Sequence, residues 1–315
     1  MVMPARYLLN WGSNGARERY SAGVIGLIAL LAPPQEPAAF RAVFEDRPRQ
    51  LIVRLLNEPG DGGIYALFSP DVCAVRRVWH GRINYRGKVY DFSQENSFGE
   101  GRSLYEVPGQ VLGPTDFGQP SSAADPVWRF TQVGHAVESR PFNLENWGPL
   151  YFAFEERGDT DSVAIELSDA RRQPVYQYLS SNTISGPNVW QWNYKQMPAL
   201  PGRFQGQIRI SAPTLKAPKD VRRARLFGDR LAWFRGESPV PVQFRGYHRE
   251  DDKTTIRFTA DSRPIELTMT MEGSLLIMRY RATAAGPALT LRTYQPNVPD
   301  PTLGEAAEAT VEVRR

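Results

Sequence analysis

The chain has 315 residues, of which 41% are hydrophobic and 23% are charged. This composition excludes an intrinsically disordered protein, and the length is sufficient for two domains of ordinary size. The net charge is only +4, and the basic residues are scattered apart from the group Arg222, Arg223 and Arg225. Because nucleic-acid-binding proteins concentrate Lys and Arg in a stripe, we do not expect a nucleic acid as the partner.

The N-terminal segment, residues 1–40, contains the chain's uncharged apolar run at residues 22–32, which includes Leu27 and Leu30. Two arginines precede this run and two prolines follow it, a pattern typical of an export signal. The run is shorter than the roughly 20 residues that cross a bilayer. It therefore acts as an uncleaved signal that anchors the chain, as a segment inserted among partner helices, or as a buried helix. Trp11 is a candidate contact at a membrane interface or under a partner.

The first β-domain is expected at residues 41–130. Short runs rich in β-branched and aromatic residues alternate there with turn signals, such as the NEPGDGG sequence at 57–63. This pattern predicts an antiparallel meander, and the Gly- and Pro-rich residues 113–127 predict a linker after it. The expected strands are 50–56, 64–68, 72–79 and 88–92. The single cysteine, Cys73, lies in the third of these strands, and we interpret it as a buried apolar thiol.

The second β-domain is expected at residues 131–315. We expect 150–155 to pair with 162–167 across a turn at Gly158, and 303–309 to form a short helical turn. The predicted fold is thus all-β, with two antiparallel β-sandwich-like domains after an N-terminal apolar segment. The further expected strands are 175–179, 188–194 and 206–211, followed by five successive strands at 242–247, 254–259, 265–271, 275–282 and 288–293.

Motifs for catalysis, cofactor binding and metal binding are missing from the sequence. The histidines His80, His135 and His248 lie far apart and have no ligand spacing. Acidic clusters coincide with expected turns, where they are normally solvated. We therefore expect no catalytic residues, no cofactor and no metal. A pair of glycosidase-type carboxylates could still be brought together by a β-fold, so a hydrolase or lyase stays an alternative.

The sequence VWQWNY places Trp190, Trp192 and Tyr194 on one face of an expected strand, because successive side chains of a strand point to opposite sides. Three interpretations remain open. The rings form a core face, a stacking platform for sugar rings, or a hot spot for a protein partner.

Two segments, residues 65–93 and 244–260, carry a resemblance that covers about a third of the chain. They resemble a β-rich module of large secreted bacterial proteins, in which it accompanies c-type cytochrome, PA14-like and glucose/sorbosone-type dehydrogenase domains. The chain lacks the haem motif and any dehydrogenase domain. The resemblance implies an extracytoplasmic β-sandwich that neighbours electron-transfer proteins, and it implies no catalytic residue. The matching positions are Tyr65, Asp71, Cys73, Trp79, Gly81, Gly246, Tyr247 and Phe258.

Three functions follow as hypotheses. The first is a non-catalytic, periplasmic and membrane-associated accessory subunit. It would dock on a membrane electron-transfer complex, either a respiratory enzyme or a photosynthetic reaction centre, with a c-type cytochrome as a candidate contact and residues 22–32 at the membrane. The second is a carbohydrate-binding module linked to sugar oxidation. The third is an unrecognised β-sandwich hydrolase or lyase. Site chemistry must decide among them, because fold does not determine function.

Overall fold

The structure is a computed structural model that describes residues 39–58, 62–85, 96–118, 127–158, 162–180, 189–200, 202–250, 253–295, 298–304 and 308–314. The described residues form antiparallel strands and one 3-10 helix, η1 (Pro114–Asp116), which confirms the all-β prediction. No helix in this described part of the chain is long and apolar enough to cross a membrane. Trp11, Leu27, Leu30 and the predicted strand at 88–92 lie outside the described residues.

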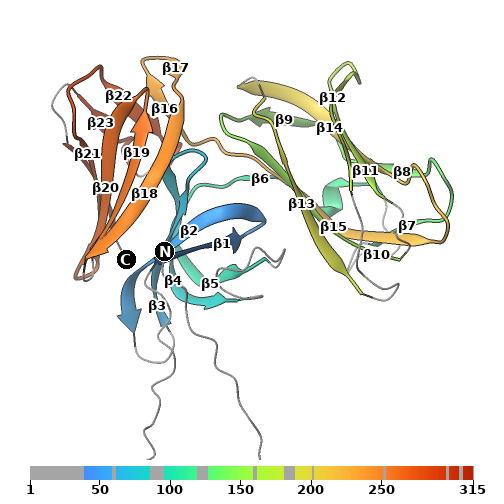
Figure 1. Cartoon of the computed structure of the whole chain (residues 1–315), viewed down its shortest axis with the longest axis horizontal. Helices are drawn as coiled ribbons and strands as arrows, with labels where there is room; N and C mark the ends of the chain where they lie inside the picture. The colour runs from blue at the N-terminus through green and yellow to red at the C-terminus, as the bar shows by residue number, and fades with distance from the viewer. Residues whose placement is uncertain are drawn as a thin grey trace, which may run out of the picture. The chain divides into compact units, whose positions relative to one another are not determined.

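The first sheet is a meander of five strands in sequence order, which confirms the predicted antiparallel arrangement (Figure 1). Its strands pair antiparallel throughout. Cys73 is buried, as expected, but it does not lie in a strand. It ends the turn before the fourth strand and has a φ of +49°. The strands are β1 (Ala39–Phe44), β2 (Arg47–Glu58), β3 (Gly62–Ser69), β4 (Ala74–Asn84) and β5 (Phe98–Glu106).

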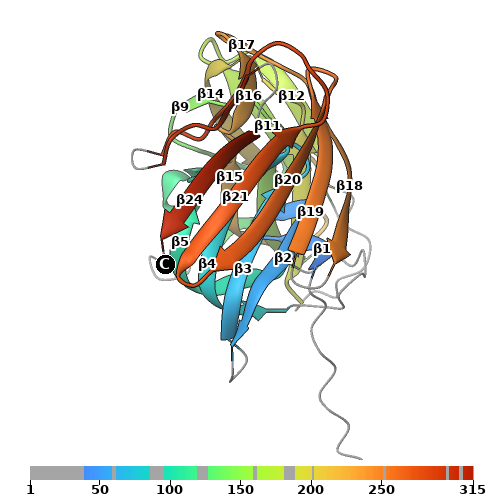
Figure 2. The ribbon, with the colours of Figure 1, turned by 90° about the vertical axis from the view of Figure 1, so that its left-hand side faces the viewer.

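The C-terminal part forms a second five-stranded sheet and a smaller four-stranded sheet. Four of the five successive strands predicted here lie side by side in one sheet, while the fifth belongs to the small sheet (Figure 2). The predicted helical turn at 303–309 is wrong at both described ends, since Leu303 and Glu308 belong to strands that close the two sheets. The large sheet contains β18 (Val242–Glu250), β19 (Lys253–Ala260), β20 (Arg263–Glu272), β21 (Leu275–Ala282) and β24 (Glu308–Arg314), and the small sheet contains β16 (Ala232–Arg235), β17 (Ser238–Pro239), β22 (Leu289–Arg292) and β23 (Thr302–Leu303).

Two further five-stranded sheets occupy the middle of the chain. One has the order β13-β10-β15-β6, with β7 also paired to β15, and the other has the order β12-β11-β14-β8, with β9 also paired to β14. The strands are β6 (Gln110–Leu112), β7 (Val127–Phe130), β8 (Ala136–Glu138), β9 (Phe142–Glu145), β10 (Leu150–Gly158), β11 (Ala164–Asp169), β12 (Pro174–Leu179), β13 (Gln191–Met197), β14 (Arg203–Ser211) and β15 (Lys219–Phe227).

The expected pairing of residues 150–155 with 162–167 is wrong. These residues lie in β10 and β11, which belong to different sheets. Phe152 and Phe154 of β10 instead share a buried cluster with Ile165 and Leu167 of β11. Both strands present an apolar face, so their buried side chains meet in one cluster although the strands do not pair.

The chain forms two hydrophobic cores, and the first of them combines residues from two separate stretches of the sequence. The first core draws its buried residues from 51–107 and again from 231–313, whereas the second draws its residues from 112–226. A smaller cluster on the other face of the first sheet includes an aromatic stack, in which Trp79 lies 5.6 Å from the Phe44 ring and 5.3 Å from the Tyr65 ring. The domain boundary expected near residue 130 stays a prediction.

The second core contains a buried ion pair. Lys219 Nζ lies 2.7 Å from Glu156 Oε2, and both side chains have no exposed surface. Asn193 Nδ2 also donates to Glu156, at 2.8 Å. Burial raises the pKa of Glu156, which Lys219 and Asn193 act to lower. Removing one partner therefore leaves an uncompensated polar group in an apolar core.

We expect Lys219→Met to lower the free energy of unfolding by about 3–5 kcal/mol, because Glu156 loses its buried counter-ion. The double variant Lys219→Met with Glu156→Leu should recover most of that loss. Urea unfolding of the three proteins measures both effects. Equal losses in the single and double variants would contradict the account.

Candidate functional site

The outer face of the β13-β10-β15 sheet carries the aromatic residues that the sequence singled out. Trp192 pairs in register with Glu155, and Tyr194 with Ala153, so these rings lie on the face opposite to Phe152 and Phe154. Trp190, Trp192 and Tyr194 are all half-buried. The structure thus places the three rings close together on a partly exposed outer face.

Part of this face is covered by the turn between β1 and β2. Trp192 Nε1 donates to Asp46 Oδ1 at 3.1 Å, and Arg225 Nη2 donates to the same oxygen at 2.9 Å. Burial raises the pKa of Asp46, while Arg225 and Trp192 counteract the rise. The Trp192 ring also lies 4.9 Å from Tyr194 at a tilt of 30°. Trp192 therefore links the β1–β2 turn to this sheet, and Tyr194 packs beside Trp192.

The uncovered part is a continuous network of arginines around Trp190. Its ring centroid lies 4.6 Å from Arg157 Cζ and 4.0 Å from Arg222 Cζ. Arg157 also binds Asp220, and Arg222 binds Glu155. Each carboxylate takes a second guanidinium, from Arg129 on Asp220 and from Arg223 on Glu155. We call these residues the Arg–Trp190 surface: Arg129, Arg157, Trp190, Arg222, Arg223, Asp220 and Glu155.

The charge of the Arg–Trp190 surface is positive and its geometry is fixed. Four guanidinium groups meet two carboxylates. Hydrogen bonds from Arg129 and Arg157 hold the pKa of Asp220 below its usual range, although burial acts in the opposite direction. Arg129 and Arg223 are 60% and 43% exposed, so their charge reaches solvent. Val189, next to Trp190 in sequence, is 59% exposed. Trp and Arg are the residues most enriched at protein interfaces.

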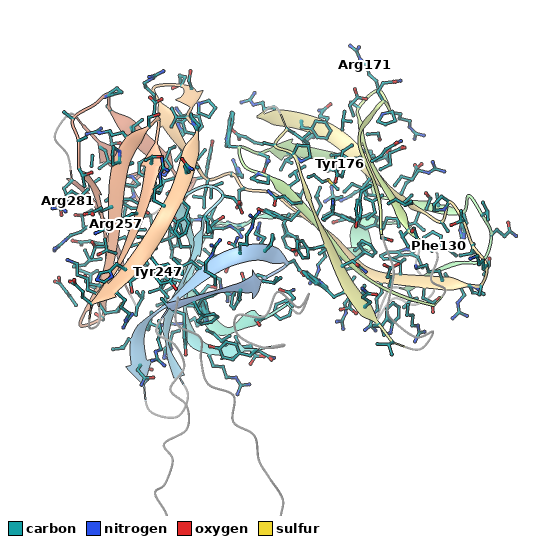
Figure 3. The ribbon with its side chains drawn as sticks, viewed as in Figure 1. Phe130, Arg171, Tyr176, Tyr247, Arg257 and Arg281 are labelled. Carbon is teal, nitrogen blue, oxygen red and sulfur yellow. The ribbon has the colours of Figure 1, made fainter. Side chains whose placement is uncertain are left out.

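A second arginine pair serves as a reference for this geometry. On the C-terminal sheet, Arg257 and Arg281 both bind Glu266, at 3.1 Å and 2.7 Å (Figure 3). Both arginines are about as exposed as Arg129, at 60% and 62%. Their contacts in the described part of the chain include no aromatic ring. This pair has the same charges as half of the Arg–Trp190 surface but lacks its aromatic centre.

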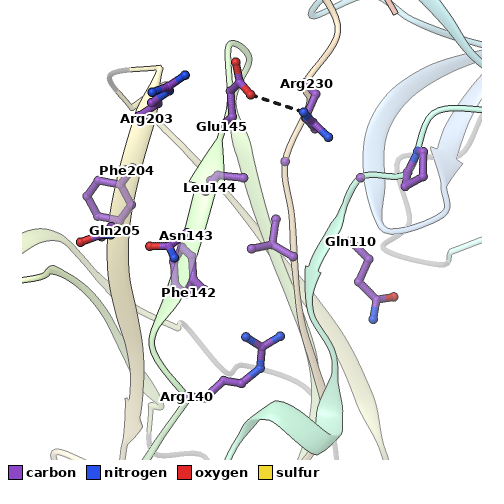
Figure 4. Close-up of a pocket in the computed structure, with 14 residues that line it drawn as sticks. Gln110, Arg140, Phe142, Asn143, Leu144, Glu145, Arg203, Phe204, Gln205 and Arg230 are labelled. Atoms are coloured by element: carbon purple, nitrogen blue, oxygen red, sulfur yellow. Dashed lines mark hydrogen bonds and ion pairs between the residues drawn. The ribbon is translucent and has the colours of Figure 1, made fainter. Parts of the chain in front are cut away.

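A pocket of about 730 Å³ lies beside β9, between the start of β14 and the chain segments at 108–111 and 228–230 (Figure 4). Arg140, Arg203 and Arg230 contribute three guanidinium groups to its lining, and Arg230 Nη2 donates to Glu145 Oε2 at 3.4 Å. The amides of Gln110, Asn143 and Gln205 and the rings of Phe142 and Phe204 complete the polar and aromatic lining. The pocket can offer charged and neutral hydrogen-bond donors to a polar ligand.

The described side chains form no cluster of three or more His, Cys, Asp or Glu residues that could hold a metal ion. The three histidines occupy separate places. His80 contacts Glu58, His248 contacts Glu250, and His135 packs on the Phe130 ring. The arrangement of the described residues is therefore suited to binding by charge and aromatic contact.

Sequence reasoning found the aromatic strand and the arginine run at 222–225, but it missed Arg129, Arg157 and Asp220. These three residues come from strands that lie next to one another only in the folded sheet, where Arg157 pairs with Asp220 and Asp220 with Arg129. Alternation within each strand could have placed each side chain on a face. It could not have shown which strands are neighbours.

Comparison with known proteins gives no identity. No protein-family model matches the chain, and no curated protein matches it.

We expect the stability of the fold to depend on Asp220 at low pH. The pKa of Asp220 is lower in the folded state than in the unfolded state, so its contribution is present above the ordinary carboxyl pKa and is lost as the pH falls through the folded value. Asp220→Asn should be less stable than the native protein at pH 7. The two stabilities should converge between about pH 5 and pH 2. Urea unfolding across this range measures the convergence.

The control is Glu237→Gln, which neutralises a carboxylate that is 92% exposed. Its stability should follow that of the native protein at every pH. A constant difference between Asp220→Asn and the native protein would contradict the proposed role of the two arginines.

Proposed function

We propose that the protein is a non-catalytic accessory subunit that docks on a membrane electron-transfer complex on the extracytoplasmic side, and that the Arg–Trp190 surface is its docking site. The observation that carries the docking site is the Trp190 ring held between two guanidinium groups on an exposed face. The surplus of positive charge fits an acidic surface of a partner, such as a c-type cytochrome or another subunit of the complex.

The complex is either a respiratory enzyme or a photosynthetic reaction centre, and the sequence resemblance supports only its role in electron transfer. The contact of residues 22–32 with the membrane is part of the same proposal. The proposal also includes a fold of two β-sandwich-like domains, one built around each hydrophobic core. In that arrangement the second core would present the docking face, because the Arg–Trp190 surface lies on a sheet whose inner side belongs to it.

The docking proposal predicts that reversing two peripheral charges breaks the complex. Arg129→Glu with Arg223→Glu leaves Asp220 bound to Arg157 and Glu155 bound to Arg222, so the sheet should stay folded. The tagged proteins would be used to recover partners from gently solubilised native membranes. We expect the double variant to reduce recovery on the order of tenfold or more, which corresponds to about 1.4 kcal/mol or more.

The matched control is Arg257→Glu with Arg281→Glu, which changes the net charge by the same amount on the C-terminal five-stranded sheet. It should recover the partner as the native protein does. Trp190→Ala should also weaken recovery, since buried aromatic anchors dominate interface energies. Equal loss in both double variants would indicate non-specific charge attraction and contradict the assigned site. If the native protein were recovered without any partner, docking itself would be contradicted.

The pocket beside β9 favours a second candidate function, a carbohydrate-binding module for acidic sugars. Guanidinium groups bind carboxylates through paired hydrogen bonds, and side-chain amides bind hydroxyl groups. By contrast, guanidinium groups already contact the Trp190 ring, and Trp192 is tied to Asp46. The pocket is therefore a better candidate sugar site than the aromatic strand that the sequence suggested.

This second function predicts binding of uronate-containing oligosaccharides that depends on Arg203, an exposed residue at the rim of the pocket. Calorimetric titration should show an affinity that falls about tenfold or more in Arg203→Ala, because one charge-assisted hydrogen-bond donor is lost. Arg209→Ala, a substitution on the same strand but outside the pocket lining, should bind as the native protein does. The absence of measurable binding by the native protein would remove this candidate.

A further inference from the structure

A cavity of about 200 Å³ lies where the chain passes between its two hydrophobic cores. It lies between β2, β4 and the segment at 107–110, and the guanidinium groups of Arg47, Arg76 and Arg77 contribute to its lining. Since one water molecule occupies about 30 Å³ of liquid, the cavity has room for a small polyatomic ion with water.

The two inner arginines share one protein carboxylate. Arg47 and Arg76 are only 2% and 4% exposed, and both turn toward one carboxylate, that of Asp229. Arg76 Nε lies 2.7 Å from Asp229 Oδ1, and Arg47 Nη2 lies 3.8 Å from it. Burial and the neighbouring Arg76 lower the pKa of Arg47 to about 10, which still leaves it protonated at neutral pH. These two guanidinium groups therefore share one carboxylate within ion-pair distance, and Glu45 acts on Arg47 from further away.

Several hydrogen-bond donors at this site have no partner. Arg47 Nε, Arg76 Nε and Arg76 Nη1 are buried without a hydrogen bond, because even the close contact of Arg76 with Asp229 lacks the required direction. Buried polar groups of native proteins nearly always bind protein, ordered water or an ion. Three such donors on two adjacent cations indicate a missing acceptor that is itself negative.

Gly109 allows both arginines to approach the backbone closely. A Cβ atom at this position would lie 2.3 Å from Arg47 Nη2, 2.5 Å from Arg76 Nη2 and 2.7 Å from the carbonyl oxygen of Gly228. Both guanidinium groups thus converge on the glycine backbone. The third arginine, Arg77, forms ion pairs with Glu45 and Glu106, the two acidic side chains that also line the cavity.

We propose that this cavity is a binding site for a small oxyanion of the phosphate or sulfate type, with Arg47 and Arg76 as its principal ligands. The ion would provide acceptors for the three donors. It would also strengthen the connection between the two cores, because Arg47, Arg76 and Gly109 lie where the chain crosses from one core to the other.

The test is the thermal unfolding of the full chain in inorganic phosphate or sulfate, with sodium chloride holding the ionic strength constant. A ligand that binds only the folded state raises its melting temperature with ligand concentration. We expect a saturable rise of about 3 °C or more, and calorimetric titration should give one site per chain. Arg76→Met should lose the rise, whereas Arg257→Met should keep it.

Two further measurements test the proposal if the Arg76→Met variant cannot be used. If Arg76→Met does not fold, the stoichiometry of the native protein and the behaviour of Arg129→Glu with Arg223→Glu decide the question. That double variant should keep the full rise, because its substitutions lie outside the cavity lining. Loss of the rise in it would assign the anion to the Arg–Trp190 surface and overturn the proposal. The absence of saturable, anion-specific stabilisation in the native protein would also overturn it.

Discussion

The arrangement of this protein depends on one buried carboxylate shared by two arginines. Asp229 lies where the chain returns to the first core, and Arg47 and Arg76 approach it from the first sheet. The backbone N–H of Asp229 donates to the Asn146 side chain, and the backbone N–H of Gly228 donates to the carbonyl oxygen of Gly109. In a low-dielectric interior, leaving a charged or polar group without such a partner is costly. These contacts therefore determine how the segment around Asp229 packs against the first sheet and Gly109.

The turn between β1 and β2 also determines which part of the outer face of the β13-β10-β15 sheet is left uncovered. The turn that carries Asp46 and Arg47 covers Trp192, Arg225 and Phe227. Trp190 and its arginines stay outside this contact. A face that would otherwise be an extended row of aromatic rings becomes a smaller surface in which one ring is surrounded by fixed charges. In the docking that we propose, such a surface would discriminate among partners by charge as well as by apolar contact.

Local sequence signals predicted most strands, because alternation of side chains and turn residues act over a few neighbouring positions. The hairpin between the predicted strands 254–259 and 265–271 is an example, since Asp261 and Ser262 between them have the positive φ that a tight hairpin requires. The same signals failed where distant packing decided the outcome. Cys73 lies in a stretch of sequence typical of a strand, but the structure places it in a turn. The carbonyl oxygen of Cys73 accepts a hydrogen bond from Trp233 Nε1. The residues around Leu303 pair with a distant strand instead of forming a helical turn.

The sequence by itself determined the all-β class, the strands β2–β4, β10–β14 and β18–β22, and the aromatic residues Trp190, Trp192 and Tyr194. Only the tertiary structure decided which strands are neighbours, and therefore that Arg129, Arg157 and Asp220 join Trp190 and that Arg47 and Arg76 meet Asp229. The physical reason is that hydrophobic burial specifies which side of a strand faces inward but is nearly indifferent to its partner. Partner choice follows from packing two cores and satisfying buried charges at once, which no short stretch of sequence records.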